Sequence, residues 1–424
     1  MDTGMSIEKK THHYANIFQG DKAIWMIFFF LCAISLIEVY SAASNLSYKA
    51  GDYWMPVLRH ASFLFGGAVI AIVFHNIPCR WFKFYPIITI PVSFLLLLFV
   101  IIMGATTNGA ARWLSIFGIP LQPSEIAKGG VVVGVALILS ALQTDKGADR
   151  HAYKYILWIT IPICLLILPE NFSTAILLFS VVLMMMFIGR VPLVQIGKLL
   201  GILALLGLVF GTFIIITPNE KLDKIPLGHR FSTWKNRLNT FSEGNNKQLS
   251  AQDFNIDENA QISHANIAIA TSNVIGKFPG NSVERDFLSQ AFSDFIYAII
   301  IEEMGLPGGT FVVLLYIVIL FRASKIANRC ERNFPAFLVL GLSLLMVTQA
   351  LINMAVAVGL FPVTGQPLPL ISRGGASTIV NCVYIGMILS VSRFAKKRQP
   401  ENTIDKTSSS NMIESEFVRD EGLQ

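Results

Sequence analysis

The sequence predicts an all-α polytopic membrane protein with about ten transmembrane helices, both termini in the cytoplasm and one large extracytoplasmic loop. Hydrophobic residues make up 53% of the 424 residues and charged residues only 14%, whereas an ordinary globular domain has about 25% charged residues. Several apolar runs reach about 18 residues or more, the length of a membrane-spanning helix. The lysines and arginines are concentrated in alternate connectors, which is typical of multi-pass membrane proteins.

The predicted spans follow one another along most of the chain. In order they are roughly 23–43, 59–77, 85–104, 124–143, 154–170, 173–190, 195–217, 294–321, 335–360 and 375–393. Residues 1–22 form a polar segment without the small-residue cleavage site of a signal peptide, so we expect a cytoplasmic amino-terminal segment. The transmembrane domain covers 23–393 with the extracytoplasmic loop at 218–293, and the polar composition of 394–424 predicts a disordered cytoplasmic tail.

The distribution of basic residues predicts which connectors face outward. On one side of the predicted bundle lie Lys9, Lys10, Lys22, Arg80, Lys83, Lys146, Arg150, Lys154, Arg190, Lys198, Arg322, Lys325, Arg329, Arg332, Arg393, Lys396, Lys397 and Arg398. The short loops of the other side hold only Lys49, Arg59, Arg112 and Arg373. The connectors 105–123 and 361–374 are therefore predicted to face outward together with the long loop.

The cysteines and the net charge argue against two other classes of protein. The cysteines lie in apolar spans or beside basic connectors and are Cys32, Cys79, Cys164, Cys330 and Cys382. Because none lies in the long loop, the disulfide framework of a secreted protein is not predicted. The net charge of +6 follows from the basic connectors, so no nucleic-acid partner is expected.

The stretch 289–308 carries carboxylates where an apolar helix begins. Asp294 lies at the junction with the polar loop, and Glu302 and Glu303 follow about two helical turns deeper. Carboxylates inside an apolar span are energetically costly and by default indicate a functional site. Ser293 or Asp294 could instead be the N-cap that accepts the first free amide hydrogens of the helix. The local pattern leaves both interpretations open.

Two outward connectors carry further polar groups. Glu125 and Lys128 open the fourth span and share one helical face, either as a structural ion pair or as part of a site. The last connector, 361–375, contains prolines and paired glycines, so we expect a tightly folded or re-entrant segment rather than a helix. Arg373 among these glycines suits an anionic group, above all a phosphate. The outer face is thus predicted to form a cavity with basic groups and one well-placed carboxylate.

The long loop has two distinct parts. Residues 221–241 place aromatic and basic side chains at helical spacing, so this segment either lies on the outer leaflet or binds an anionic lipid headgroup. Residues 243–266 are rich in Asn, Gln, Ser and Asp and are predicted to be mobile.

Four motifs in order make the chain similar to a known family. They are Ala111-Arg-Trp-Leu with Gln122-Pro-Ser-Glu-Ile-Ala-Lys128, Pro169-Glu-Asn-Phe-Ser-Thr-Ala175, Ser293-Asp-Phe-Ile-Tyr-Ala with Glu302-Glu-Met-Gly, and Pro362-Val-Thr-Gly-Gln-Pro-Leu-Pro-Leu-Ile-Ser-Arg-Gly-Gly375. Through them about 20–395 resembles the SEDS family (shape, elongation, division and sporulation). Members of this family are polytopic glycosyltransferases that polymerise lipid II into peptidoglycan.

The resemblance implies roles for the matching residues. Asp294 matches the family's essential loop aspartate and would be the general base of the reaction. The candidates for binding the substrate, including its pyrophosphate, are Arg112, Glu125, Lys128, Arg285, Ser372 and Arg373. The residues interpreted as structural polar groups are Glu302, Glu303 and Asn353, with Asn353 or Gln349 as hydrogen-bond partners of the two glutamates. No metal site and no tightly bound cofactor are expected, although a divalent cation, Mg2+ or Mn2+, could share the stabilisation of charge.

Some residues depart from the family pattern. Arg373 replaces the tyrosine of a Ser-Tyr-Gly-Gly signature, and Arg285 stands where a lysine is common. The usual Leu-Pro-Glu before the aspartate is Leu-Ser-Gln at 288–290, and the glycine-rich stretch is altered at 270–282. These departures change the loop that precedes Asp294 but leave the aspartate in place.

The implied function is that of a peptidoglycan glycosyltransferase in the bacterial cytoplasmic (inner) membrane, at the division septum. It would polymerise lipid II by an inverting displacement of undecaprenyl pyrophosphate. The long cytoplasmic ends and the last motif favour the division branch (FtsW-like) over the elongation branch (RodA-like). Expected partners are lipid II, a class B penicillin-binding protein transpeptidase and other division proteins. The alternatives are a lipid II flippase, which predicts charged groups at the cytoplasmic mouth, and a non-catalytic division scaffold, which leaves Asp294 without a purpose.

Overall fold

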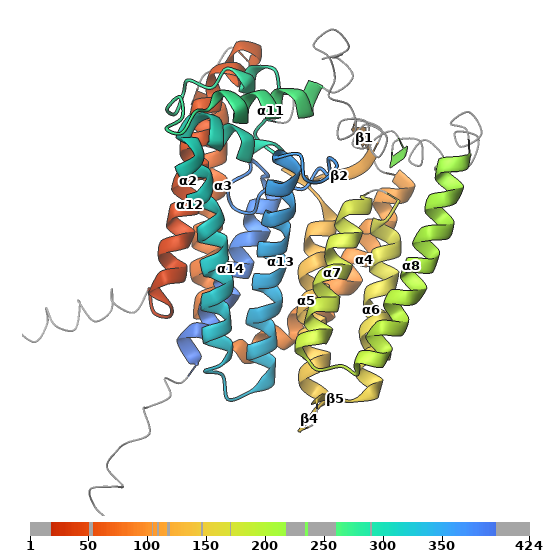
Figure 1. Cartoon of the computed structure of the whole chain (residues 1–424). Coiled ribbons are helices and arrows are strands. Elements are labelled where there is room, and N and C mark those ends of the chain that lie inside the picture. Colours follow the sequence, from red (N-terminus) through yellow and green to blue (C-terminus); the bar gives the residue numbers. More distant parts are fainter. Residues whose placement is uncertain are drawn as a thin grey trace, which may run out of the picture.

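The computed structural model describes residues 18–395 apart from 51–53, 104, 108–109, 117–118, 146, 170, 218–233, 236–259 and 289–290. Within these residues every predicted span coincides with one helix of a bundle (Figure 1). The helices are α2 (Lys22–Ala50), α3 (Trp54–Asn76), α4 (Tyr85–Met103), α5 (Pro123–Ala141), α6 (Arg150–Ile167), α7 (Phe172–Ile188), α8 (Leu193–Ile216), α12 (Ile296–Ala327), α13 (Asn333–Ala357) and α14 (Ala376–Phe394). The expected helical membrane fold is confirmed.

The helices differ in how clearly they qualify as membrane spans. In the described part of the chain, eight helices are long and apolar enough to cross a membrane. α7 is apolar but has only 17 residues, and α6 carries Arg150 and Lys154 in its first turns, which lower its mean hydropathy. Both nevertheless pack in the same bundle, against α5 and against each other. The chain is a multi-pass membrane protein.

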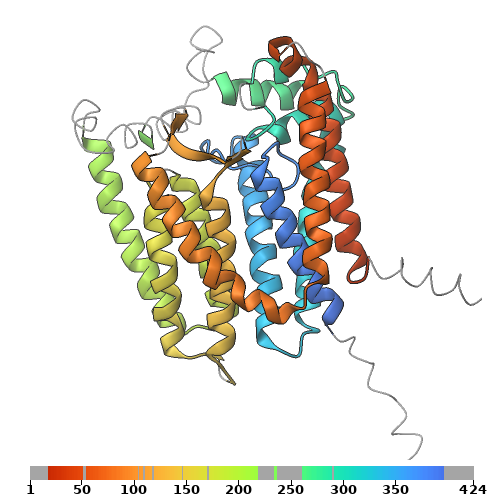
Figure 2. The same ribbon diagram turned by 180° about the vertical axis from the view of Figure 1, so that it is seen from behind.

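α13 lies at the centre of the bundle and packs against α5, α7, α12 and α14. Gly341 allows close packing on this helix, because a Cβ at that position would lie 2.6 Å from the Cε of Met185. α8 lies at the edge in both views (Figures 1 and 2), and only 11% of its apolar window is buried within the molecule. Most of its apolar surface is therefore left for lipid.

The two ends of the bundle are built differently (Figure 2). One end, here called the termini end, holds both ends of the described chain, and the backbone N–H of Asp21 donates a 2.6 Å hydrogen bond to Ser392 Oγ there. This end also holds η1 (Cys79–Phe84) and the short strands β4 (Gln143–Thr144) and β5 (Gly147–Ala148). The opposite, site end holds β1 (Ala105–Thr107), β2 (Ala110–Ile116), β3 (Ile119–Leu121), α11 (Ala260–Thr271) and η2 (Glu284–Asp286).

Two elements at the site end differ from the sequence-based expectations. The connector after α4 forms an antiparallel three-stranded sheet in the order β1-β2-β3, with Ala105 opposite Trp113 and Leu114 opposite Leu121. The expectation of a mobile segment up to residue 266 is wrong in part, because α11 begins at Ala260. The predicted tail beyond 395, residues 1–17 and the segment 221–241, apart from 234–235, lie outside the described residues.

α12 is kinked near its beginning, at Gly305, whose φ of 69° and ψ of −174° are not helical. Pro307 follows two residues later and lacks the N–H that would bond to the carbonyl of Glu303 in a regular helix. The carbonyls of Glu302 and Glu303 instead accept hydrogen bonds from the N–H groups of Lys277 and Phe278, at 2.9 and 2.7 Å. The loop before η2 is thus attached to the first part of α12 by main-chain hydrogen bonds.

The last connector, 358–375, is irregular and folds into the bundle, as its prolines and glycines predicted. The side chains of Leu368, Leu370 and Ile371 are buried. The hydroxyl of Tyr316 on α12 donates a short hydrogen bond to the carbonyl of Pro369. Ser35 Oγ on α2 donates a 2.7 Å hydrogen bond to the carbonyl of Ile371. Polar side chains of neighbouring helices therefore satisfy the exposed backbone of this segment, as irregular backbone at membrane depth requires.

Candidate active site

The backbone around Asp294 is fixed by hydrogen bonds from α13 and from the last connector. Ser372 Oγ donates to the carbonyl of Ser293 at 2.6 Å. The N–H of Arg373 donates to the carbonyl of Phe292 at 2.9 Å, and Asn353 Nδ2 donates to the carbonyl of Asp294 at 2.8 Å. Three consecutive carbonyls are thus held by elements that follow them by about sixty to eighty residues, which gives the site a defined backbone geometry.

The Asp294 side chain is partly exposed and accepts a 2.7 Å hydrogen bond from Ser293 Oγ. α12 begins at Ile296, with Phe295 as the N-cap residue and without a hydrogen bond from a capping side chain. The interpretation of Ser293 or Asp294 as the N-cap of this helix is therefore wrong. The carboxylate lies two residues before the start of α12, and the backbone just before it is hydrogen-bonded to Ser372 and Arg373. From this position it can act on a molecule at the site end.

Asn353 links Asp294 to the core of the bundle. Its Nδ2 also donates to the carbonyl of Gln366, at 2.7 Å. The Gln366 side chain in turn donates a 2.6 Å hydrogen bond to Thr174 Oγ1 on α7. The second and the fourth sequence motifs thus meet directly behind the aspartate. Asn353 is buried, and its partners are these carbonyls and not the glutamates of α12.

Glu125 and Lys128 form a fully enclosed ion pair at the start of α5. Lys128 Nζ lies 2.7 Å from Glu125 Oε1, and both side chains are almost completely buried. Lys128 Nζ also donates to Gln349 Oε1 at 2.7 Å, and Gln349 Nε2 donates to the carbonyl of Pro367 at 2.9 Å. All the polar atoms named here have protein partners, so in this structure the pair supports the last connector. Removing one partner of such a buried ion pair leaves an uncompensated buried charge and strongly destabilises the folded protein.

Arg373 brings a positive charge to the last connector, whose main chain is hydrogen-bonded to the backbone before Asp294. Its guanidinium is half-buried, and no side chain in the described residues pairs with it. Burial lowers the pKa of the Arg373 guanidinium, and the nearby Arg59 charge lowers this pKa further. Arg373 is half-buried and Arg59 is exposed, and the two cations repel each other, so an anionic ligand close to both would be stabilised. This is the arrangement expected of a phosphate-binding site.

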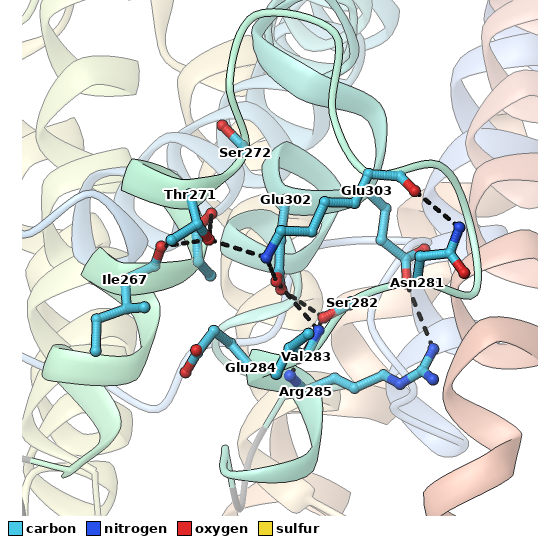
Figure 3. A network of polar contacts seen from close by, with 12 residues as sticks. Ile267, Thr271, Ser272, Asn281, Ser282, Val283, Glu284, Arg285, Glu302 and Glu303 are labelled. Carbon is cyan, nitrogen blue, oxygen red and sulfur yellow. Dashed lines mark hydrogen bonds and ion pairs between the residues drawn. The ribbon is translucent and has the colours of Figure 1, made fainter.

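Arg285 lies in a second polar cluster, next to the loop before Asp294 (Figure 3). Its Nη1 donates to the carbonyl and to the hydroxyl of Ser41 on α2, at 2.7 and 2.8 Å, and lies 3.5 Å from Glu303 Oε1. Ser41 Oγ also donates a short hydrogen bond to Glu303. With these contacts the Arg285 side chain is 10% exposed, and the structure does not bring it together with Arg373.

Glu302 completes the second cluster. It pairs with Lys277 Nζ at 2.7 Å and accepts hydrogen bonds from Ser282 Oγ at 2.5 Å and from the N–H of Val283 at 3.1 Å. Both glutamates of α12 are fully buried. Their structural role stays a prediction. Their partners belong to the loop 277–285 and to α2, so the expectation of Asn353 or Gln349 as partners is wrong.

The sequence did not identify some polar residues of the site end as candidates for the site. Arg59 lies on α3 and approaches Arg373 only through the fold. His60 Nε2 shares a 2.7 Å hydrogen bond with Ser35 Oγ, beneath the last connector. The signal that could have found them is the presence of polar residues within or at the mouth of predicted apolar spans. Arg112 lies on β2, and its side chain is outside the described residues.

The described geometry offers a base and a cationic region. Within the part of the chain that the structure describes, no three His, Cys, Asp or Glu side chains are grouped to hold a metal ion. The carboxylate of Asp294 can accept a proton from a hydroxyl, and Arg373 can stabilise negative charge on a leaving group.

Comparison with known proteins agrees with these motifs. A family model for FtsW, RodA and SpoVE, described as cell cycle protein, matches residues 21–397. A probable peptidoglycan glycosyltransferase FtsW of Halomonas elongata is 30% identical over 380 residues, which cover 87% of this chain and 90% of that protein.

Solved structures show the same fold. A chain from a study of polymerization and crosslinking by a peptidoglycan synthase complex aligns with a TM-score of 0.68 and 22% identity, over 89% of this chain and 99% of that chain. The rod shape determining protein RodA of Thermus thermophilus aligns with a TM-score of 0.60 and 20% identity, over 89% and 98%. Because the family model spans nearly the whole chain and a curated relative is 30% identical over most of both sequences, the chain belongs to the FtsW/RodA/SpoVE family of cell cycle proteins.

Proposed function

We propose that the protein is a peptidoglycan glycosyltransferase that polymerises lipid II, with Asp294 as the general base. The observation that carries this proposal is the partly exposed Asp294 carboxylate on a fixed backbone, where the main-chain N–H of Arg373 is hydrogen-bonded to the carbonyl of Phe292. The curated relatives named as probable peptidoglycan glycosyltransferases FtsW support the same activity. They also favour the division branch of the family over the elongation branch.

The reaction is a single displacement at the anomeric carbon of the donor sugar. Asp294 takes the proton of the acceptor's 4-hydroxyl while the oxygen of this hydroxyl attacks the anomeric carbon. The bond from the anomeric carbon to the pyrophosphate oxygen breaks. Undecaprenyl pyrophosphate leaves with the bonding electrons, so an α-linked donor gives a β-linked product. The negative charge on the leaving oxygen is stabilised by Arg373, with Arg59 as the second cation of the same region.

The remaining candidates act on the geometry of the site. Ser372 and Asn353 are positioning residues, because their side chains hold the carbonyls of Ser293 and Asp294. Glu125 and Lys128 position the last connector through Gln349. Arg285 secures the loop before Asp294, and Arg112 on β2 stays a candidate for direct substrate contact.

The proposal also includes a protein partner, a location in the cell and the question of a divalent cation. A peptidoglycan synthase complex among the structural neighbours supports a transpeptidase partner, a class B penicillin-binding protein, docked on the site end. The division-type relatives support a place at the septum. The described side chains offer no site for a divalent cation of their own, and no step of the displacement described above depends on one.

The decisive experiment replaces Asp294 by Asn in the full chain. Asn keeps an oxygen that can accept the Ser293 hydrogen bond, but it loses the charge and nearly all basicity. We expect Asp294→Asn to accumulate normally and to lose about two to four powers of ten in polymerisation rate. The measurement is a gel of glycan chains made from labelled lipid II by the purified protein with its transpeptidase partner.

Asp145→Asn is the matched control, because it makes the same charge change in an exposed turn at the termini end. It should polymerise at the rate of the unaltered chain. Substantial glycan synthesis by well-folded Asp294→Asn would refute the assignment of the base. Absence of glycan from the unaltered chain, together with transfer of lipid II across vesicles, would favour the flippase, and absence of both would favour the scaffold.

A further inference from the structure

A basic cavity opens at the termini end, on the opposite side of the bundle from Asp294. Its volume is about 590 Å3, and it lies between the beginning of α2, the end of α12 and the end of α14. The charged residues of its lining are Asp21, Lys22, Arg322, Arg329 and Arg393. Neither the predicted displacement reaction nor the contacts around Asp294 use this cavity.

The charges of the cavity do not cancel. Arg322 is paired with Asp21 through both carboxylate oxygens, and Asp21 also accepts the N–H of Ala23 at 3.0 Å as α2 begins. Arg393 Nη1 donates to Asn76 Oδ1, a neutral acceptor, at 2.6 Å. Lys22, Arg329 and Arg393 therefore keep their positive charges without a carboxylate partner among the described residues.

Exposed apolar side chains occur close in sequence to the lining residues on α2, α12 and α14. Met26 and Phe29 follow Lys22 on the same face of α2 and are 57% and 48% exposed. Phe321 directly precedes Arg322 on α12, and Phe394 directly follows Arg393 on α14. The three helices are membrane spans, so their ends lie near the headgroup level and these side chains lie near the acyl chains.

We propose that this cavity binds the headgroup phosphate of an anionic phospholipid. The cationic lining supplies donors for phosphate oxygens, and basic pockets between spans at the headgroup level are suited to acidic lipids. A soluble anionic ligand would also explain the charges, but the cavity lies at the ends of three membrane spans and therefore at the headgroup level of the bilayer, where a phospholipid phosphate is found. Phospholipid bound here would tie together the ends of α2, α12 and α14, at the end of the bundle where both chain ends leave.

The test measures lipid binding by the full chain in a neutral detergent. Fluorescent phosphatidylglycerol is titrated into the purified protein, with equally labelled phosphatidylcholine as the neutral reference. We expect a clear preference for phosphatidylglycerol, and we expect Lys22→Gln combined with Arg329→Gln to weaken its binding about thirtyfold, roughly fivefold per residue. Both side chains are exposed, so folding should survive the substitutions, and an unchanged thermal unfolding midpoint would verify this.

Lys154→Gln combined with Lys198→Gln is the matched control, since it removes two basic residues from other helices that begin at the termini end. It should leave phosphatidylglycerol binding within about twofold. Equal binding of the two lipids, or equal loss in the control and the cavity variant, would overturn the proposal. So would full competition by inorganic phosphate at millimolar concentration, which would indicate a site for a soluble anion. Binding seen only after removal of the acidic segment 399–424 would assign the cavity to the chain's own tail.

Discussion

Arg373, Lys128 and Arg285 have the same predicted role but different surroundings in the structure. The position of Arg373 among glycines predicts an anion-binding role, and this stays a prediction; its guanidinium is half-buried, and its main-chain N–H bonds to the carbonyl of Phe292. Lys128 and Arg285 had the same predicted role but are enclosed by protein partners. The partners Gln349 and Ser41 are more than two hundred residues away in sequence, so no local pattern could distinguish the enclosed cations from the open one.

The role of Arg373 leads to a kinetic prediction. Arg373→Ala should raise the lipid II concentration needed for half-maximal rate about ten- to hundredfold, because a charge-assisted hydrogen bond to the pyrophosphate is lost. Arg373→Lys should recover only part of this loss, since a point charge replaces a planar fork of donors. The concentration dependence of glycan synthesis measures both effects.

Arg150→Ala is a suitable control, because it removes an exposed arginine at the other end of the molecule. If Arg373→Ala and Arg150→Ala both keep the original concentration dependence, Arg373 serves packing and the pyrophosphate is held by other cations.

At the scale of elements, apolar length predicted the helices well and failed for the small structures between them. Each span is a local property of about twenty residues. The sheet β1-β2-β3 depends instead on pairings such as Ala105 with Trp113, in strands too short to show a period. α11 lies in a polar stretch, and its buried residues Ala265 and Ala268 are too small to signal an apolar face.

The kink of α12 gives a prediction at this scale. A Cβ at Gly305 would lie 2.4 Å from the carbonyl oxygen of Val274, and the positive φ is strained for any other residue. Gly305→Ala should therefore destabilise the protein by about 1–3 kcal/mol. It should also lower the polymerisation rate, because the first part of α12 follows directly on Asp294. Thermal unfolding in detergent and the glycan assay measure the two effects.

The control is Gly207→Ala on α8, where an added Cβ meets no atom within 4 Å. Alanine favours a helix interior over glycine by about 0.5–1 kcal/mol, so this variant should unfold at the same temperature or slightly higher. A Gly305→Ala protein that matched it in both assays would show that the kink tolerates a side chain.

At the scale of the whole molecule, the fold class and the order of the helices were predictable, because apolar spans and basic connectors can be recognised from the local sequence. The proximity of Asp21 and Ser392, near the two ends of the described chain, agrees with an even number of crossings between them. The assignment of the site end to the outside of the cell rests on the basic residues alone. The way in which α13 brings four sequence motifs together required the three-dimensional structure, since each motif lies on a different element.

Labelling of introduced cysteines tests the orientation. In a chain whose native cysteines have been replaced, Val274→Cys at the site end should react with a membrane-impermeant maleimide added to spheroplasts. Asn328→Cys at the termini end should react only after the membrane is permeabilised. Both original side chains are exposed in the structure, so access to reagent should depend on the side of the membrane. The reverse labelling pattern would place Asp294 in the cytoplasm and separate it from an extracytoplasmic pool of lipid II.

The hydrogen bonds that hold the backbone at 292–294 have a consequence for how this protein can evolve. Each of them ends on a main-chain carbonyl, and a carbonyl is supplied by every amino acid. A substitution at Phe292 therefore leaves its acceptor in place, whereas Ser293 has a second constraint, because its hydroxyl donates to the Asp294 carboxylate. The donors at Asn353 and Ser372 have no such freedom, because their side chains make the bonds. Selection to keep the aspartate in position is thus exerted mainly on residues far from it in the gene.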